Sequence, residues 1–230
     1  MKSTKSWSNL LQILSNTEEL LYIISNEKGN IPRKDITTYA VPVSLRMKKS
    51  LRKYKIKLND IENIELLKKE IKSIMNREYR GVTRYRGINF DNITNTEGKN
   101  TIEIRMPNGT VNADTWIQNI NLFGGIVKIA EETAEMQSKD ENQLSLEEKR
   151  KLDLFNKLGR DKLKNKEKLK ILLDLVIDQK QQDEYIERYN INSKLLKSNP
   201  KFRQRLKADI SKKPLRISKK KKKKKEEITK

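Results

Sequence analysis

Apolar residues recur at spacings of three and four along most of this 230-residue chain, and they alternate with polar residues in only two short stretches. The first spacing is typical of amphipathic α-helices, and alternation is typical of half-buried strands. We therefore expect a helix over residues 7–27, broken near Ser15 and Asn16, and another from residue 60 onward. Further helices are expected after residue 112, over 145–159, around 169–176 and around 185–189.

The two alternating stretches are residues 83–90 and 101–106. The linker between them, "DNITNTEGK", is rich in turn-forming residues, which favours an antiparallel pair of strands. The expected fold class is therefore α+β, with a small antiparallel sheet packed by amphipathic helices.

Helix ends are marked by local signals. Asn112 or Asp114 is placed to cap the helix that follows the second strand, and "SLEE" at 145–148 is a capping box. Gly29 is expected to end the first helix in a left-handed conformation. In the helix after residue 112 we expect Trp116 and Phe123 to face the core.

Composition excludes several kinds of site. The sequence has no cysteine and no histidine, which removes disulfides, zinc sites and the usual general base. A metal held by this chain would be a hard cation on oxygen ligands, such as Mg²⁺. No apolar run approaches the length that spans a bilayer, so we expect a cytoplasmic protein with no membrane partner.

Positive charge dominates, with a formal net charge of +21 and seven consecutive lysines at Lys219–Lys225. We expect residues 1–198 to form the folded region and residues 199–230 to be a disordered basic tail. Such a tail attracts nucleic acid without discriminating sequence. One hypothesis is therefore a small basic helical protein that binds nucleic acid through surface charge and its Lys-rich tail.

The second strand carries opposite charges two residues apart, Glu103 and Arg105, which places both side chains on one face. Arg84 and Arg86 on the first strand are expected to share that face. One interpretation is a solvated sheet surface with cross-strand ion pairs, each worth about 0.2–1 kcal/mol. The other is a cation-binding carboxylate among guanidinium groups that hold phosphate or carboxylate.

The motif "TIEIRMPNGT", preceded by "RYRGIN" and followed by "TWIQNINLF", resembles the C-terminal core of the amidoligase family. That family belongs to the carboxylate–amine ligases with a glutamine synthetase-like fold. The resemblance extends over about residues 8–197, and residues 84–123 carry its specific part.

The resemblance implies ATP-dependent amide bond formation through an acyl phosphate, with ATP and Mg²⁺ as cofactors and a carboxylate and an amine as substrates. It assigns the metal to Glu103 and catalytic contacts with substrate or phosphate to Arg105 and Arg86. It assigns nucleotide phosphate contacts to Arg84 and Arg86. Three further positions that look typical of the motif are expected to position the turn and the strand: Asn89, Asn108 and Thr110.

The family's N-terminal half supplies an acidic strand with paired glutamates, a glycine-serine element and a histidine-bearing strand, and this sequence offers no candidate for them. The acidic pair Glu18-Glu19 lies in a helical stretch that we expect to be exposed. We therefore expect a site that is incomplete on its own, in a split, decayed or truncated ligase. A partner chain would then supply the missing half.

Overall fold

The computed structural model describes residues 1–30, 60–79, 86–95, 97, 101–159 and 163–198. The described part is mostly helical with one two-stranded antiparallel sheet, which confirms the α+β class. The expected basic tail at 199–230 and the candidate site residue Arg84 lie outside the described residues. The helices are α1 (Thr4–Ile24), α3 (Ile64–Tyr79), α4 (Ala113–Met136), α5 (Leu146–Leu158), α6 (Asn165–Val176) and α7 (Gln179–Ser198); the strands are β1 (Ile88–Asn89) and β2 (Glu103–Ile104), and the 3₁₀ turns are η3 (Asp91–Thr94) and η4 (Glu141–Gln143).

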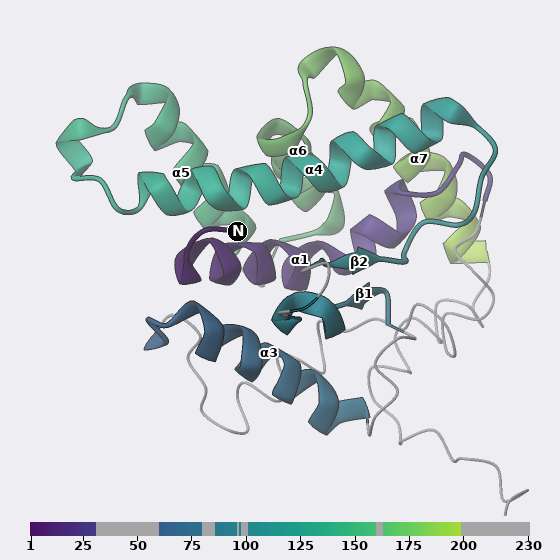
Figure 1. Cartoon of the computed structure of the whole chain (residues 1–230). Helices are drawn as coiled ribbons and strands as arrows, with labels where there is room; N and C mark the ends of the chain where they lie inside the picture. Colours follow the sequence, from purple (N-terminus) through teal and green to yellow (C-terminus); the bar gives the residue numbers. More distant parts are fainter. Residues whose placement is uncertain (31–59, 80–85, 96, 98–100, 160–162, 199–230) are drawn as a thin grey trace, which may run out of the picture.

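Helix α1 forms the middle of the molecule. In Figure 1 α4 runs across one side of it, while α3 lies on the other side, with η3 and the sheet between. Its residues are buried on nearly every side, because α4, α6 and α7 all pack against it. Even Glu18 is buried, at 3% exposure, so the expectation that the pair Glu18-Glu19 is exposed is wrong for its first member.

The expected break in α1 is absent. Ser15 and Asn16 donate side-chain hydrogen bonds to the carbonyl of Gln12, and Thr17 donates to the carbonyl of Ile13. Bonds of this kind let polar residues remain inside a helix. Ser3 caps the N-terminus by accepting from the backbone N–H of Ser6 at 3.1 Å.

The C-terminal end of α1 is capped by helix α7. The amide of Asn192 donates to the carbonyls of Ile23 and Glu27 at 3.0 and 3.1 Å, and it accepts from the N–H of Gly29 at 3.0 Å. Arg188, also buried, donates to the carbonyl of Ile24. These bonds satisfy carbonyls that a helix end leaves without intrahelical partners. Gly29 has φ of 81°, which confirms its expected left-handed conformation. It does not end the helix as expected, because α1 already ends at Ile24 with Ser25 as its C-cap.

Helix α4 carries the residues that later define the site. Asn112 caps it by accepting from the N–H of Thr115 at 3.1 Å, as predicted. Its inner face packs on α1 and is tied to it by Asn9, whose amide donates to Thr133 and Gln137. The buried apolar residues of α4 are Leu122, Ile126, Ile129, Ala130, Ala134 and Met136.

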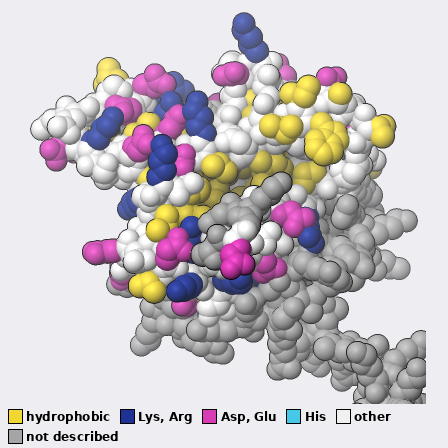
Figure 2. All heavy atoms as spheres, in the orientation of Figure 1, with side chains coloured by type: hydrophobic (Ala, Val, Ile, Leu, Met, Phe, Trp, Pro, Cys, Tyr) yellow, Lys and Arg dark blue, Asp and Glu magenta, His cyan; other side chains and the backbone are white. Residues whose placement is uncertain are grey.

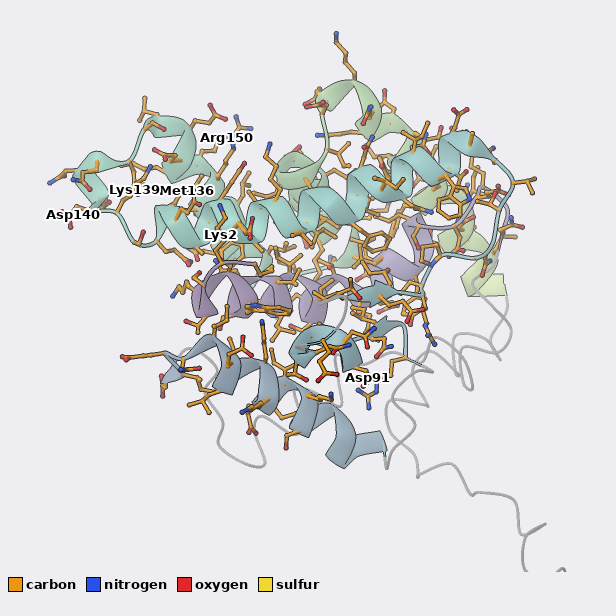
Figure 3. The ribbon with its side chains drawn as sticks, viewed as in Figure 1. Lys2, Asp91, Met136, Lys139, Asp140 and Arg150 are labelled. Atoms are coloured by element: carbon orange, nitrogen blue, oxygen red, sulfur yellow. The ribbon has the colours of Figure 1, made fainter. Side chains whose placement is uncertain are left out.

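The predicted capping box at the start of α5 is confirmed. Ser145 accepts from the N–H of Glu148, and the carboxylate of Glu148 accepts from the N–H of Ser145. The ammonium of Lys139, 2.7 Å away in the turn that joins α4 to α5 (Figure 3), lowers the pKa of Glu148 to about 2. Gly159 ends the helix as expected, and α6 begins at Asn165.

Candidate functional site

The two strands pair in a single register. Ile88 lies opposite Ile104 and Asn89 lies opposite Glu103, and the N–H of Arg105 donates to the carbonyl of Gly87 at 2.7 Å. Residues directly opposite each other in an antiparallel pair share a face. The cross-strand neighbour of Glu103 is therefore an asparagine and not an arginine.

This register corrects the expected arrangement of the arginines. Arg86 lies three positions before Asn89 and two before Ile88, so the strand period places it on the face of Ile88 and Ile104, away from Glu103. Its side chain is fully buried. The expectation that Arg86 shares a face with Glu103 and Arg105 is thus wrong, because it assumed a pairing shifted by one residue.

Glu103 and Arg105 form a forked ion pair along β2. The guanidinium donates from Nε to one carboxylate oxygen at 2.6 Å and from Nη2 to the other at 2.7 Å. Asn89 adds a bond from its amide at 3.2 Å. Bonding to Arg105 is the main cause that lowers the pKa of Glu103, with Asn89 adding to it, so the carboxylate is ionised at neutral pH.

The turn after β2 is fixed onto the end of α1. The N–H of Asn108 donates to the side chain of Asn26 at 2.7 Å, and the hydroxyl of Thr110 bonds to the carboxylate of Glu27. Pro107, Asn108 and Gly109 make the reversal that joins strand to helix, as expected of these residue types. Because α7 caps the same end of α1, the turn rests on a network of buried and part-buried hydrogen bonds.

Trp116 stands beside this turn and is 59% exposed, so the expectation that it belongs to the core is wrong. Its indole N–H donates to the carbonyl of Thr110 at 2.9 Å, which fixes the ring against the turn. Phe123 is half-buried. Ile117 and Ile120 are exposed as well, and Figure 2 shows hydrophobic side chains gathered over the N-terminal end of α4.

A pocket of about 640 Å³ joins these features. The charged pair Glu103 and Arg105 lies on its strand side, and the N-terminal part of α4 forms the opposite wall. The other residues that line it are Ile102, Ile104, Pro107, Asn108, Gly109, Thr110, Trp116, Asn119, Ile120 and Phe123. Glu103 and Arg105 thus both line this pocket, together with Ile102 and Ile104 from the other face of the strand. That the side chains of Glu103 and Arg105 point into it together stays a prediction.

Sequence reasoning missed two features of this pocket, its aromatic wall and Asn119. The amide of Asn119 donates to the carbonyl of Ser25 at 2.9 Å, while its Oδ1 atom is buried without a hydrogen-bond partner. The sequence held a signal for both features. The apolar residues of this helix cover more than one face, which indicates a second apolar surface, and Asn119 lies one turn after Trp116 on it.

Comparison with known families gives one match. The model of a family described as "putative amidoligase enzyme" matches residues 2–127, which is more than half of the chain. The chain belongs to this amidoligase family. The matched span contains α1, α3, both strands and the first part of α4, and hence every residue that lines the pocket. Neither the curated proteins nor the solved structures contain a significant match.

The acidic residues of this amidoligase-family chain do not by themselves make a metal site. Among the described residues, no three carboxylates gather where a cation would be held. Glu103 offers a single carboxylate to the pocket, and both its oxygens already accept from Arg105. Resident Mg²⁺ therefore does not fit the described residues alone, since Mg²⁺ is held by several oxygen ligands.

No helix in the described part of the chain is long and apolar enough to span a membrane.

Proposed function

We propose that this protein is an ATP-dependent carboxylate–amine ligase whose substrate pocket is the one beside β2. This proposal rests on one observation: Glu103 and Arg105, held in one forked pair, line a pocket of about 640 Å³ within the span that matches the amidoligase family. We further propose that the catalytic part is related to glutamine synthetase-like domains.

The proposed reaction has two steps. A carboxylate oxygen of the first substrate attacks the γ-phosphorus of ATP, so that ADP leaves and an acyl phosphate forms. The amine then attacks the acyl carbon, inorganic phosphate leaves with the C–O bond electrons, and the amine gives up its proton to water or a nearby base. A guanidinium suits both steps, because its planar donors match carboxylate and phosphate oxygens in pairs.

Arg105 is the residue that we propose contacts substrate carboxylate or phosphate, since it lines the pocket. Phosphate binding by Arg84 and Arg86 remains a prediction. For Arg86 it requires that the buried side chain becomes accessible when nucleotide binds. Asn89 holds Glu103, and Asn108 with Thr110 fixes the turn, so the geometry supports their expected positioning roles.

Binding of Mg²⁺ by Glu103 likewise remains a prediction, and it needs oxygen ligands from beyond the described residues. The pocket is walled by charged groups on one side and exposed apolar groups on the other. We propose that a further polypeptide segment, from this chain or a partner chain, completes it. Nucleic-acid binding through the Lys-rich tail also remains a prediction, since that tail lies outside the described residues.

The test uses the full-length purified chain and measures MgATP binding by calorimetry, then release of ADP in the presence of pooled amino acids and dicarboxylic acids. Arg105→Lys keeps the charge but loses the fork, so we expect nucleotide or acid binding to weaken at least about tenfold. The matched control is Arg150→Lys on α5, an exposed arginine that does not line the pocket.

We expect Glu103→Gln to reduce ADP release, whereas Glu147→Gln, an exposed carboxylate on α5, leaves it unchanged. MgATP binding that is identical in wild type, Arg105→Lys and Glu103→Gln would contradict the assignment of this pocket. Polyanion binding with a steep salt dependence, in a chain that shows no nucleotide binding, would favour the nucleic-acid alternative instead.

A further inference from the structure

Arg105 lines the pocket and has a second, unused edge. Its Nε and Nη2 atoms are engaged with Glu103, while its Nη1 atom donates to no acceptor among the described residues. A guanidinium has five N–H donors in a fixed plane, so the Nη1–Nη2 edge can still bind a carboxylate. The bond to Glu103 holds the side chain in place, which reduces the conformational entropy that a ligand must overcome.

Glu103 keeps acceptor capacity of its own. A carboxylate has about four lone-pair sites, and the described hydrogen bonds use three of them, two from Arg105 and one from Asn89. Oε2 accepts from both Arg105 and Asn89, whereas Oε1 accepts from Arg105 alone and so retains one lone-pair site.

The charges of this pair select the kind of ligand. A simple anion would be attracted by Arg105 and repelled by Glu103, which lies within hydrogen-bonding distance of it. A zwitterion gains at both groups, since its carboxylate meets the guanidinium and its ammonium meets the acceptor oxygens. The electrostatics of the pocket therefore favour a ligand that carries both charges close together.

The wall that α4 forms, opposite the ion pair, favours a ligand with an apolar side chain. Trp116 is fixed by its bond to Thr110, so its ring is presented as a rigid apolar surface. Ile120 and Phe123 extend that surface along α4 into the pocket. Exposed apolar area that is arranged around polar groups is typical of binding sites.

We infer that this pocket binds a free α-amino acid with a large apolar side chain, through Arg105 and Glu103 at the backbone groups and Trp116 and Ile120 at the side chain. That this amino acid is the amine substrate rests on the proposed ligase function. The binding of the amino acid does not depend on the ligase function, because the groups that recognise it are present without nucleotide.

The experiment titrates leucine and phenylalanine into the full-length chain without ATP, and follows binding by calorimetry and by tryptophan fluorescence, to which Trp116 and the buried Trp7 contribute. Three comparison ligands each lack one feature. Glycine lacks the side chain, 4-methylpentanoate lacks the ammonium, and leucinamide lacks the carboxylate. We expect each to bind at least about tenfold more weakly than leucine, because a charge-assisted bond or a buried side chain is worth about 1.5–3 kcal/mol.

Single substitutions separate the contributions that the side-chain contact and the ammonium contact make to leucine binding. Trp116→Ala should remove the preference for leucine over glycine, and Glu103→Gln should remove the preference for leucine over 4-methylpentanoate. Ile117→Ala should change neither preference, because Ile117 is exposed on the same helix but does not line the pocket. Circular dichroism and the urea midpoint of each variant show whether it is folded.

The outcomes separate this inference from the ligase proposal. Glycine or 4-methylpentanoate binding as tightly as leucine would overturn the inference, and so would no leucine binding at millimolar concentration. If MgATP still bound in an Arg105-dependent manner in either case, the ligase proposal would stand. Leucine binding with the expected preferences, in a chain that neither binds MgATP nor releases ADP, would support the inference independently of the ligase proposal.

Discussion

Two adjacent glycines in α4 should respond in opposite ways to the same substitution. At Gly124 an added Cβ would meet no atom within 4 Å. At Gly125 it would lie 2.5 Å from the carbonyl oxygen of Val176 and 3.0 Å from its Cβ, at the end of α6. The short contact involves backbone, which cannot rotate away as a flexible side chain would. We therefore expect Gly124→Ala to stabilise the protein and Gly125→Ala to destabilise it.

The size of each effect follows from two contributions. Replacing glycine by alanine inside a helix gains about 0.5–1 kcal/mol, because alanine loses less backbone freedom on folding. Both variants receive this gain. Overpacking a close contact costs about 1–3 kcal/mol, and only Gly125→Ala incurs it. The difference between the two free energies of unfolding therefore isolates the clash and should be about 1–3 kcal/mol.

Urea unfolding followed by circular dichroism measures this difference directly. The m-values should be equal among wild type and both variants, since neither substitution changes the surface exposed on unfolding. The packing of α4 on α6 described here would be refuted if Gly125→Ala were as stable as Gly124→Ala. It would also be refuted if Gly124→Ala were the less stable of the two.

Three further comparisons test other parts of the structure. Asn192→Ala should lower the free energy of unfolding by about 1–3 kcal/mol, because it removes the side-chain donor to the buried carbonyl of Ile23 at the end of α1, whereas Asn190→Ala at an exposed position of α7 should change it by less than about 0.5 kcal/mol. Because the folded-state pKa of Glu148 is lowered from 4.5 to about 2, its charge stabilises the protein above pH 4.5, and that contribution is lost as the pH falls toward 2. Urea midpoints of wild type and Glu148→Gln should therefore differ at neutral pH and converge in acid. Ile120→Lys and Ile117→Lys should both leave the urea midpoint nearly unchanged, since both positions are exposed, but only Ile120→Lys should weaken leucine binding.

Features set by neighbours in the sequence were predictable. The capping box of Ser145 and Glu148 needs only residues three apart, and the cap at Asn112 needs only the helix that follows it. The left-handed Gly29 is equally local. The antiparallel pairing of the strands followed from the turn-rich linker between them, because short linkers favour a hairpin-like return.

Features set by distant segments were not predictable from the pattern alone. The exact register of the two strands decides whether Arg86 faces Glu103, and a shift of one residue reverses the answer. In α4, apolar residues occur on two faces, and only the position of α1 determines that Leu122 and Ile126 are buried while Trp116 is exposed. Periodicity identifies a helix, but it does not identify which of two apolar faces meets the core.

The second apolar face of α4 is what connects the fold to the proposed function. If α4 were only a structural helix, its outer positions would be expected to be polar, as in other surface helices. Instead its first two turns place Trp116 and Ile120 across a pocket from an ion pair that is fixed on β2. The turn at 107–110 ties these two walls to the end of α1 by hydrogen bonds, so their separation is determined by the core and not by a free loop. A rigid pocket with charge on one wall and apolar surface on the other can recognise the two ends of one small molecule at a fixed spacing. That requirement explains why exposed apolar residues are retained at this end of the helix.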